Sequence, residues 1–116
     1  MTVNLHDHIH PFVDAFKQTE QVEAFEKAVA AVKEDDAAKA VYMELREVMS
    51  GIYEKQAQGQ EITQEEGMKY EEVAQRAQQN ELVDAMLRAE QGVGMLMEEV
   101  TKHLLEPVQK IYETLD

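Results

Sequence analysis

The residues best suited to chemistry lie near the N-terminus, where His6, His8 and His10 alternate along the chain. On a helix, His6 and His10 would share one face, and Asp7 and Asp14 lie close by in sequence. Imidazole and carboxylate groups at such spacing are ligands for divalent transition metals. A chain end positions ligands poorly, however, and a polar terminus accounts for the same residues. His6 and His10 are the candidate metal ligands, but we favour the simpler interpretation, with neither a metal nor a cofactor.

A fourth histidine, His103, has Glu99 and Glu106 about one helical turn away on either side. A di-iron carboxylate bundle needs Glu-x-x-His pairs from two helices. The residue three positions before His103 is Val100, and the sequence holds no such pair elsewhere. We therefore interpret His103 as an ordinary residue near the end of a helix, where its positive charge would be favoured.

Other signatures of catalysis are missing from the sequence. The chain has no cysteine, which excludes disulfides, thiolate nucleophiles and cysteine-ligated zinc or iron–sulfur clusters. Gly92 and Gly94 lack the third glycine and the preceding strand of a phosphate loop, so we expect close helix contact there. Nothing around Ser50 forms a catalytic triad. We predict that the protein is not an enzyme.

The composition predicts that these residues lie on helices. The 116 residues include only two prolines and five glycines, and good helix formers dominate. We predict an all-α, bundle-like fold of about five helices in a single domain, residues 1–116. Asn4, Thr19 and Asn80 are the expected helix caps. Pro11 should kink the first helix or delay its start, and Pro107 should kink or stop the last helix and leave a short final segment.

The element around which the chain is organised is a long antiparallel helical hairpin, expected over about residues 36–79. Gly59 is suited to the left-handed position just past a helix end. Thr63 and Glu66 form a capping box that restarts a helix, and Ile62 completes the turn. So short a link makes the two helices antiparallel. Ser50-Gly51, inside the first of them, suggests a tight crossing or a slight bend.

The charge balance argues against several classes of partner. With 11 basic and 24 acidic residues, the net charge of −13 repels phosphate backbones, so direct nucleic-acid binding is not expected. Seven of the basic residues follow an acid by four positions, which spreads them along helices rather than into a patch. No signal peptide and no membrane-spanning run is visible, so we expect a cytoplasmic protein that does not bind membranes.

A few long amphipathic helices leave apolar surface that a partner could cover. The same pattern would also arise if these residues simply completed the core of the monomer, and the two interpretations are equally compatible with the sequence. The candidates for a dimer or partner surface are Tyr42, Met49, Tyr53, Val93 and Met97.

An ordered set of residues along nearly the whole chain resembles the YlbF/YmcA family, and its YheA-like branch in particular. The set comprises Val3-Asn4-Leu5, Val32, Asp36-Ala37-Ala38-Lys39, Arg46, Lys55-Gln56, Gly59, Ile62-Thr63, Glu65-Glu66, Gln78-Gln79-Asn80, Met86, Ala89-Glu90-Gln91, Leu96, Pro107 and Tyr112. The resemblance implies an all-helical, dimeric, cytoplasmic protein of Gram-positive bacteria without catalytic residues. Relatives look like adapters in a complex that modulates an endoribonuclease in RNA processing, and thereby competence, sporulation and biofilm formation. Those relatives carry cysteines for an iron–sulfur cluster, which this chain lacks.

Three hypotheses follow. The first is a non-enzymatic helical adapter that forms a homodimer and binds an unidentified protein partner. The second is a metal-dependent enzyme or metal-binding protein that uses the N-terminal histidines or His103. The third is a chaperone-like hairpin that grips non-native chains.

Overall fold

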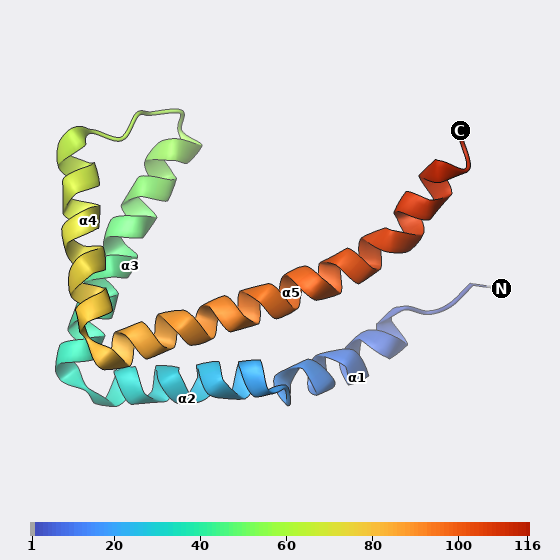
Figure 1. Cartoon of the computed structure of the whole chain (residues 1–116), viewed down its shortest axis with the longest axis horizontal. Coiled ribbons are helices and arrows are strands. Elements are labelled where there is room, and N and C mark those ends of the chain that lie inside the picture. The colour runs from blue at the N-terminus through green and yellow to red at the C-terminus, as the bar shows by residue number, and fades with distance from the viewer. Residues whose placement is uncertain (1) are drawn as a thin grey trace. The chain divides into compact units, whose positions relative to one another are not determined.

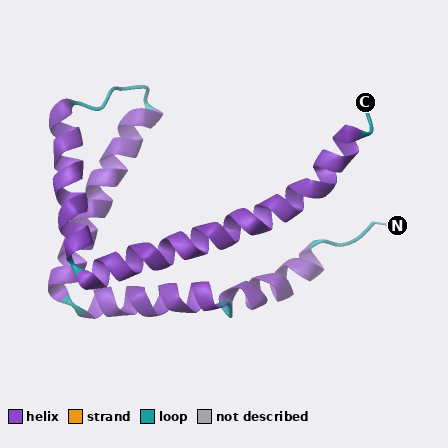
Figure 2. Cartoon of the chain, in the orientation of Figure 1, coloured by secondary structure: helices purple, strands orange, loops and turns teal. Residues whose placement is uncertain are grey.

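The structure, a computed structural model, describes residues 2–116 and contains five helices and no strand in that range (Figures 1 and 2). The predicted all-α class and number of helices are therefore confirmed. The helices are α1 (His6–Lys17), α2 (Glu20–Glu34), α3 (Asp36–Ala57), α4 (Gln64–Gln79) and α5 (Glu81–Glu113).

Polar side chains begin four of the helices by accepting hydrogen bonds from free backbone N–H groups. The Thr19 hydroxyl accepts from Val22 N at 3.3 Å before α2, and the Asp35 carboxylate accepts from Ala38 N at 2.9 Å before α3. Before α5, the Asn80 side chain accepts from Leu82 N and from Val83 N, both at 3.1 Å. The cap of α4 belongs to the hairpin tip described below.

Neither proline ends its helix, so of the alternatives left open the delayed start at Pro11 and the stop at Pro107, with a separate final segment, were wrong. The first helix passes through Pro11, and α5 continues through Pro107 to Glu113. A proline removes one N–H and leaves one carbonyl without its helical partner. Every residue from 101 to 116 is exposed, so water can bond the freed carbonyl near Pro107. The helix curves there instead of ending (Figure 1).

The expected close helix contacts at glycines were also wrong. A Cβ atom built on Gly51 or Gly94 would meet no other atom within 4 Å. At Gly92 the nearest atom is Gln21 Cγ at 3.9 Å, an ordinary van der Waals distance. These glycines therefore sit in open positions of their helices, and the packing does not require them.

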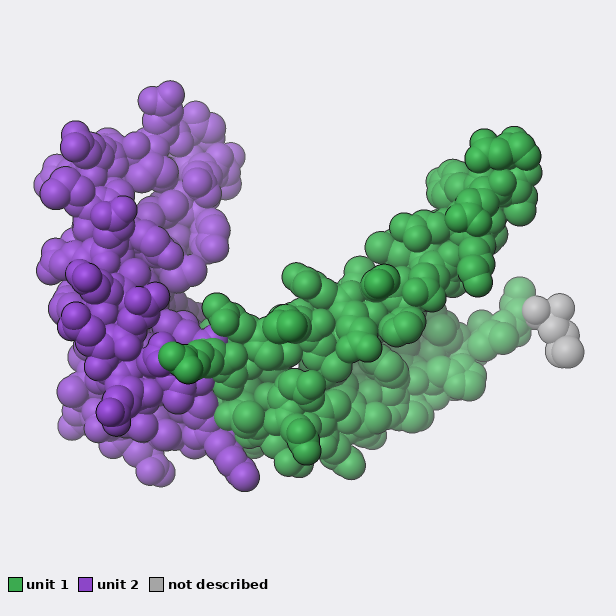
Figure 3. All heavy atoms as spheres, viewed as in Figure 1, with its two compact units in different colours: residues 1–26, 88–116 green, residues 27–87 purple. Residues whose placement is uncertain are grey.

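The chain divides into two compact units, shown in Figure 3, which we call the hairpin unit and the terminal unit. The hairpin unit comprises residues 27–87 and includes α3 and α4. The terminal unit comprises residues 1–26 and 88–116 and includes α1 and most of α5. None of the helices in the described part of the chain is long and apolar enough to cross a membrane.

The fully buried side chains all belong to the hairpin unit. Four helices supply them, at the spacing of three, four or seven residues that keeps one face of a helix inward. The buried residues are Val32 of α2, Ala38 and Leu45 of α3, Val73 and Ala77 of α4, and Val83 and Met86 of α5. Within the described part of the terminal unit, no side chain is fully buried.

Candidate functional site: the hairpin and the terminal helices

The tip of the hairpin is built by local hydrogen bonds that stop α3 and start α4. Gly59 has a φ of 75°, in the left-handed region, and Gln60 N donates to the Lys55 carbonyl at 2.9 Å. This is the geometry that closes a helix with glycine just past its end. The predicted capping box is present: Glu66 N donates to the Thr63 hydroxyl at 3.1 Å, and Thr63 N donates to the Glu66 carboxylate at 3.0 Å.

An ion pair ties the two helices together beside the tip. Lys55 Nζ of α3 lies 2.5 Å from Glu66 Oε1 of α4. The hydrogen bond from Lys55, followed by those from the Thr63 backbone and hydroxyl, lowers the pKa of Glu66 to about 2. Glu66 therefore serves two purposes, since one carboxylate both caps α4 and holds it to α3.

A second set of charges joins the hairpin near its middle. Glu44 Oε1 of α3 lies 2.7 Å from Arg76 Nη2 and 3.4 Å from Lys69 Nζ, both on α4. The hydrogen bond from Arg76 is the largest cause that lowers the pKa of Glu44, and Glu44 in turn raises the pKa of Arg76. The buried Nε of Arg76 has no hydrogen bond, and Glu72 Oε1 lies 4.0 Å from it. These pairs join α3 to α4 at a second place along the hairpin.

The perturbed pKa values of the hairpin do not indicate acid–base catalysis. A general acid needs a pKa raised towards neutrality, whereas the pKa values of Glu44 and Glu66 are both lowered. A groove of about 400 Å³ lies between α3 and α4, and its walls include Val48, Ile52 and Lys69. It combines apolar side chains with charged ones, among them Glu66, which is already engaged in an ion pair. Such a surface is suited to contact with another protein.

The candidate metal ligands are not brought together into a site. His6 and His10 lie on α1 and are exposed. His103 lies on α5, with Nδ1 3.7 Å from Glu106 Oε2. Over residues 2–116, no three histidine, aspartate or glutamate side chains converge as a metal site would require. The hypothesis of a metal-dependent protein therefore gains no support.

The five residues proposed for a partner surface fall into two groups. Tyr42 and Met49 of α3 are half-buried and Tyr53 is 62% exposed, all within the hairpin unit. Val93 of α5 is half-buried and Met97 is 55% exposed, both within the terminal unit. We therefore treat them as parts of two surfaces.

Sequence reasoning missed how much apolar surface the terminal unit exposes. Thirteen of the eighteen large apolar side chains that are exposed belong to that unit. The spacing of three and four along α5 was the available signal, but periodicity alone does not say whether a stripe is covered. The exposed apolar residues near the end of this helix are here called the α5 stripe: Leu104, Leu105, Val108, Ile111, Tyr112 and Leu115.

Comparisons with known proteins cover nearly the whole chain. The sequence model of the family described as "Control of competence regulator ComK, YlbF/YmcA" matches residues 5–109. A UPF0342 protein of Staphylococcus saprophyticus is 32% identical over 112 residues, which cover 97% of this chain and 98% of the relative. A UPF0342 protein of Staphylococcus aureus strain JH9 has the same identity and coverage.

Two solved structures have a similar fold. A protein of unknown function (DUF964) from Bacillus stearothermophilus matches with a TM-score of 0.88 at 23% identity, over 95% of this chain and 96% of that one. A chain of the crystal structure of Bacillus subtilis RicA in complex with RicF matches with a TM-score of 0.68 at 18% identity, over 97% of this chain and 99% of that one. At these identities, the likeness establishes the fold alone.

Proposed function

Because the chain belongs to the YlbF/YmcA family, we propose that it is a non-enzymatic adapter protein that self-associates and binds a protein partner. The description of the family links it to the control of competence. A chain with a similar fold was crystallised in the complex of RicA with RicF, so this fold occurs in a protein assembly. Both findings support a regulatory role that is exercised through protein contacts.

The observation that carries the proposal is the unequal burial of apolar side chains. The hairpin unit has a closed core, whereas the terminal unit exposes most of the large apolar side chains of the molecule. Exposed apolar surface of this extent marks a place where another protein binds. In this proposal the exposed apolar surface of the terminal unit serves self-association, which requires no catalytic group.

The resemblance to the better-understood relatives suggests the pathway. We propose that this chain acts in the cytoplasm, in a complex that modulates an endoribonuclease during RNA processing, with consequences for competence, sporulation or biofilm formation. The net charge of −13 favours a protein over RNA as the direct ligand. Without cysteine, the chain performs this role without an iron–sulfur cluster of its own.

We assign the partner surface to the face of α3 that carries Tyr42, Met49 and Tyr53, of which Tyr53 is exposed and the other two are half-buried. Tyrosine and methionine are both enriched at protein interfaces, because they supply large contact area. Tyr53 is the most accessible of the three. Its substitution is therefore the change expected to harm binding with the least harm to folding.

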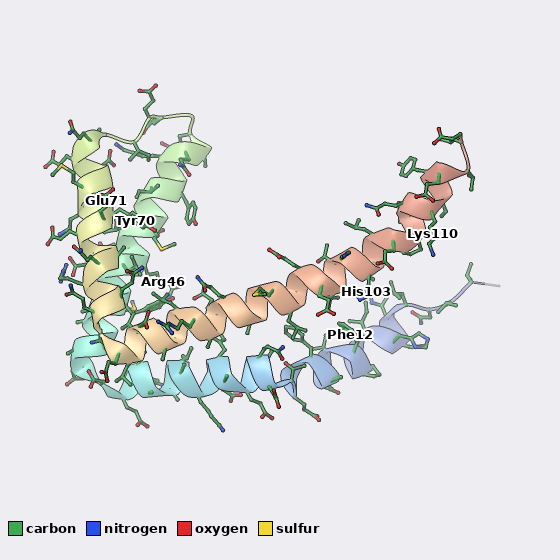
Figure 4. All side chains as sticks on the ribbon, in the orientation of Figure 1. Phe12, Arg46, Tyr70, Glu71, His103 and Lys110 are labelled. Atoms are coloured by element: carbon green, nitrogen blue, oxygen red, sulfur yellow. The ribbon has the colours of Figure 1, made fainter. Side chains whose placement is uncertain are left out.

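Affinity capture from native extract, followed by mass spectrometry, tests the proposal. The wild-type chain should retain a defined protein that an unrelated acidic helical protein does not. Tyr53→Glu should lose this protein, whereas Tyr70→Glu, on α4 (Figure 4), is the matched control and should keep it. If the wild-type chain and the unrelated protein capture the same set, the adapter proposal is refuted.

A further inference from the structure

We propose that the α5 stripe is the surface on which a second copy of this chain docks. The inference rests on the self-association proposed above and specifies where it takes place. Its starting point is that every residue from 101 to 116 is exposed, so no part of the described chain covers this end of the helix. Figure 3 shows the same end of the terminal unit standing clear of α1.

The pattern of the stripe is that of a helix that packs against another helix. Leu104, Val108, Ile111 and Leu115 follow each other at intervals of four, three and four residues. This is the period of 3.5 that keeps one seam of a helix facing a partner helix. Leu105 and Tyr112 widen the seam on one side, as in helices that face a core.

The stripe also extends towards the N-terminal part of α5. Val93 and Met97 lie on the same line, eleven and seven residues before Leu104. A groove of about 480 Å³ runs along this side of the helix, and its walls combine Met97 and Leu105 with the charged Glu98 and Lys102. The apolar line therefore extends over several turns, with charged side chains along the groove beside it.

Charge identifies a second copy as the occupant. The chain as a whole carries a net charge of −13, so two copies repel each other over most of their surface. The segment 101–116, by contrast, carries a formal charge of only −1, with two lysines against two glutamates and Asp116. Helical spacing places four of these charges, Lys102, Glu106, Lys110 and Glu113, on the face opposite the stripe.

This arrangement matters most for a symmetric pair. In a two-fold dimer both copies use the same patch of surface, so a charge beside the seam of one copy would lie near the same charge of the other copy. The positions that flank the seam between 101 and 115 hold Leu105, Tyr112, Pro107 and Thr114, none of them charged. Two copies can therefore approach along this line without meeting like charges.

The available area is close to what a dimer needs. A fully exposed side chain of this size presents roughly 60–120 Å² of apolar area. At their actual exposures, the six members of the α5 stripe together with Met97 offer roughly 260–520 Å². Each side of a standard interface contributes about 800 Å², of which roughly 60% is apolar.

Multi-angle light scattering and sedimentation equilibrium of the purified chain, from low to high micromolar concentration, test the inference. Ile111→Glu places a charge in the seam of both copies and should raise the dissociation constant by roughly tenfold or more. Ile111→Ser should weaken association without adding charge. Met68→Glu is the matched control, because Met68 on α4 is 63% exposed against 68% for Ile111 and the change in charge is the same. Circular dichroism should show unchanged helix content in all three variants.

The outcomes separate this inference from the broader proposal. If the wild type is a dimer, Ile111→Glu a monomer and Met68→Glu still a dimer, the inference holds. A dimer that survives Ile111→Glu, or that Met68→Glu dissociates equally, overturns the α5 stripe as the interface but leaves self-association standing. A wild type that is monomeric throughout overturns both self-association and this inference. The capture experiment then decides the adapter role on its own.

Discussion

Removal of the Thr63 hydroxyl tests whether the hairpin tip stabilises the fold. The hydroxyl accepts a hydrogen bond from Glu66 N at 3.1 Å, and Thr63→Ala deletes that acceptor while leaving the chain otherwise intact. The reverse bond of the capping box, from Thr63 N to the Glu66 carboxylate, survives because it uses only the backbone of residue 63. The substitution therefore removes the hydroxyl with its contacts to Glu66 and leaves the backbone half of the capping box intact.

The expected cost is about 1 kcal/mol of unfolding free energy, within the range of roughly 0.5–2 kcal/mol for loss of such a cap. The lower half of that range is appropriate for two reasons. The tip is exposed, so water can bond the freed N–H. In addition, the Lys55–Glu66 ion pair still holds α4 to α3.

Urea titrations followed by circular dichroism measure this cost, with all proteins at one concentration because self-association makes stability depend on concentration. Ser50→Ala is the control. Ser50 lies inside α3 and is exposed, and the cap of that helix is Asp35. Alanine is the better helix former, so this variant should be as stable as the wild type or more stable by up to about 0.7 kcal/mol.

Thr63→Ser should behave as the wild type, since serine keeps the hydroxyl. If Thr63→Ala is no less stable than Ser50→Ala, the hydroxyl half of the capping box contributes nothing measurable. The hairpin tip would then owe its stability to other contacts, and the reasoning from the cap would be refuted.

Two other predictions concern the same hairpin. Gly59→Ala should lower the free energy of unfolding by about 1–2 kcal/mol, because a φ of 75° is strained for any residue with a side chain. Gly51→Ala should raise it by about 0.5–1 kcal/mol, because the added Cβ meets nothing within 4 Å and alanine favours the helix. Thermal unfolding of both variants checks that the two effects have opposite signs. The pKa of Glu66 is lowered from 4.5 to about 2 by folding, so its contribution to stability is complete above pH 4.5 and is lost as the pH falls towards 2. Unfolding free energies measured across that interval should therefore fall more steeply for the wild type than for Glu66→Gln, and parallel curves would contradict the assignment.

The sequence by itself determined the local structure of this protein. Helix caps and the left-handed turn depend on residues three or four positions apart, so Asn80, Gly59, and Thr63 with Glu66 could be recognised without a three-dimensional structure. Helical periodicity likewise indicated the boundaries of the hairpin correctly. The sequence could not decide between a bend and a stop at proline, because that depends on whether the surroundings can satisfy the freed carbonyl, and near Pro107 solvent can do so.

Only the tertiary structure decided which charges meet and which apolar faces are covered. The pairing of Glu44 with Arg76 joins residues 32 positions apart, and no local spacing rule predicts such a pair. The apolar residues of α5 follow one periodicity along the helix, yet Val83 is fully buried while Ile111 is 68% exposed. Periodicity tells which side of a helix is apolar, but what covers that side is a property of neighbouring helices, which only the folded chain brings together.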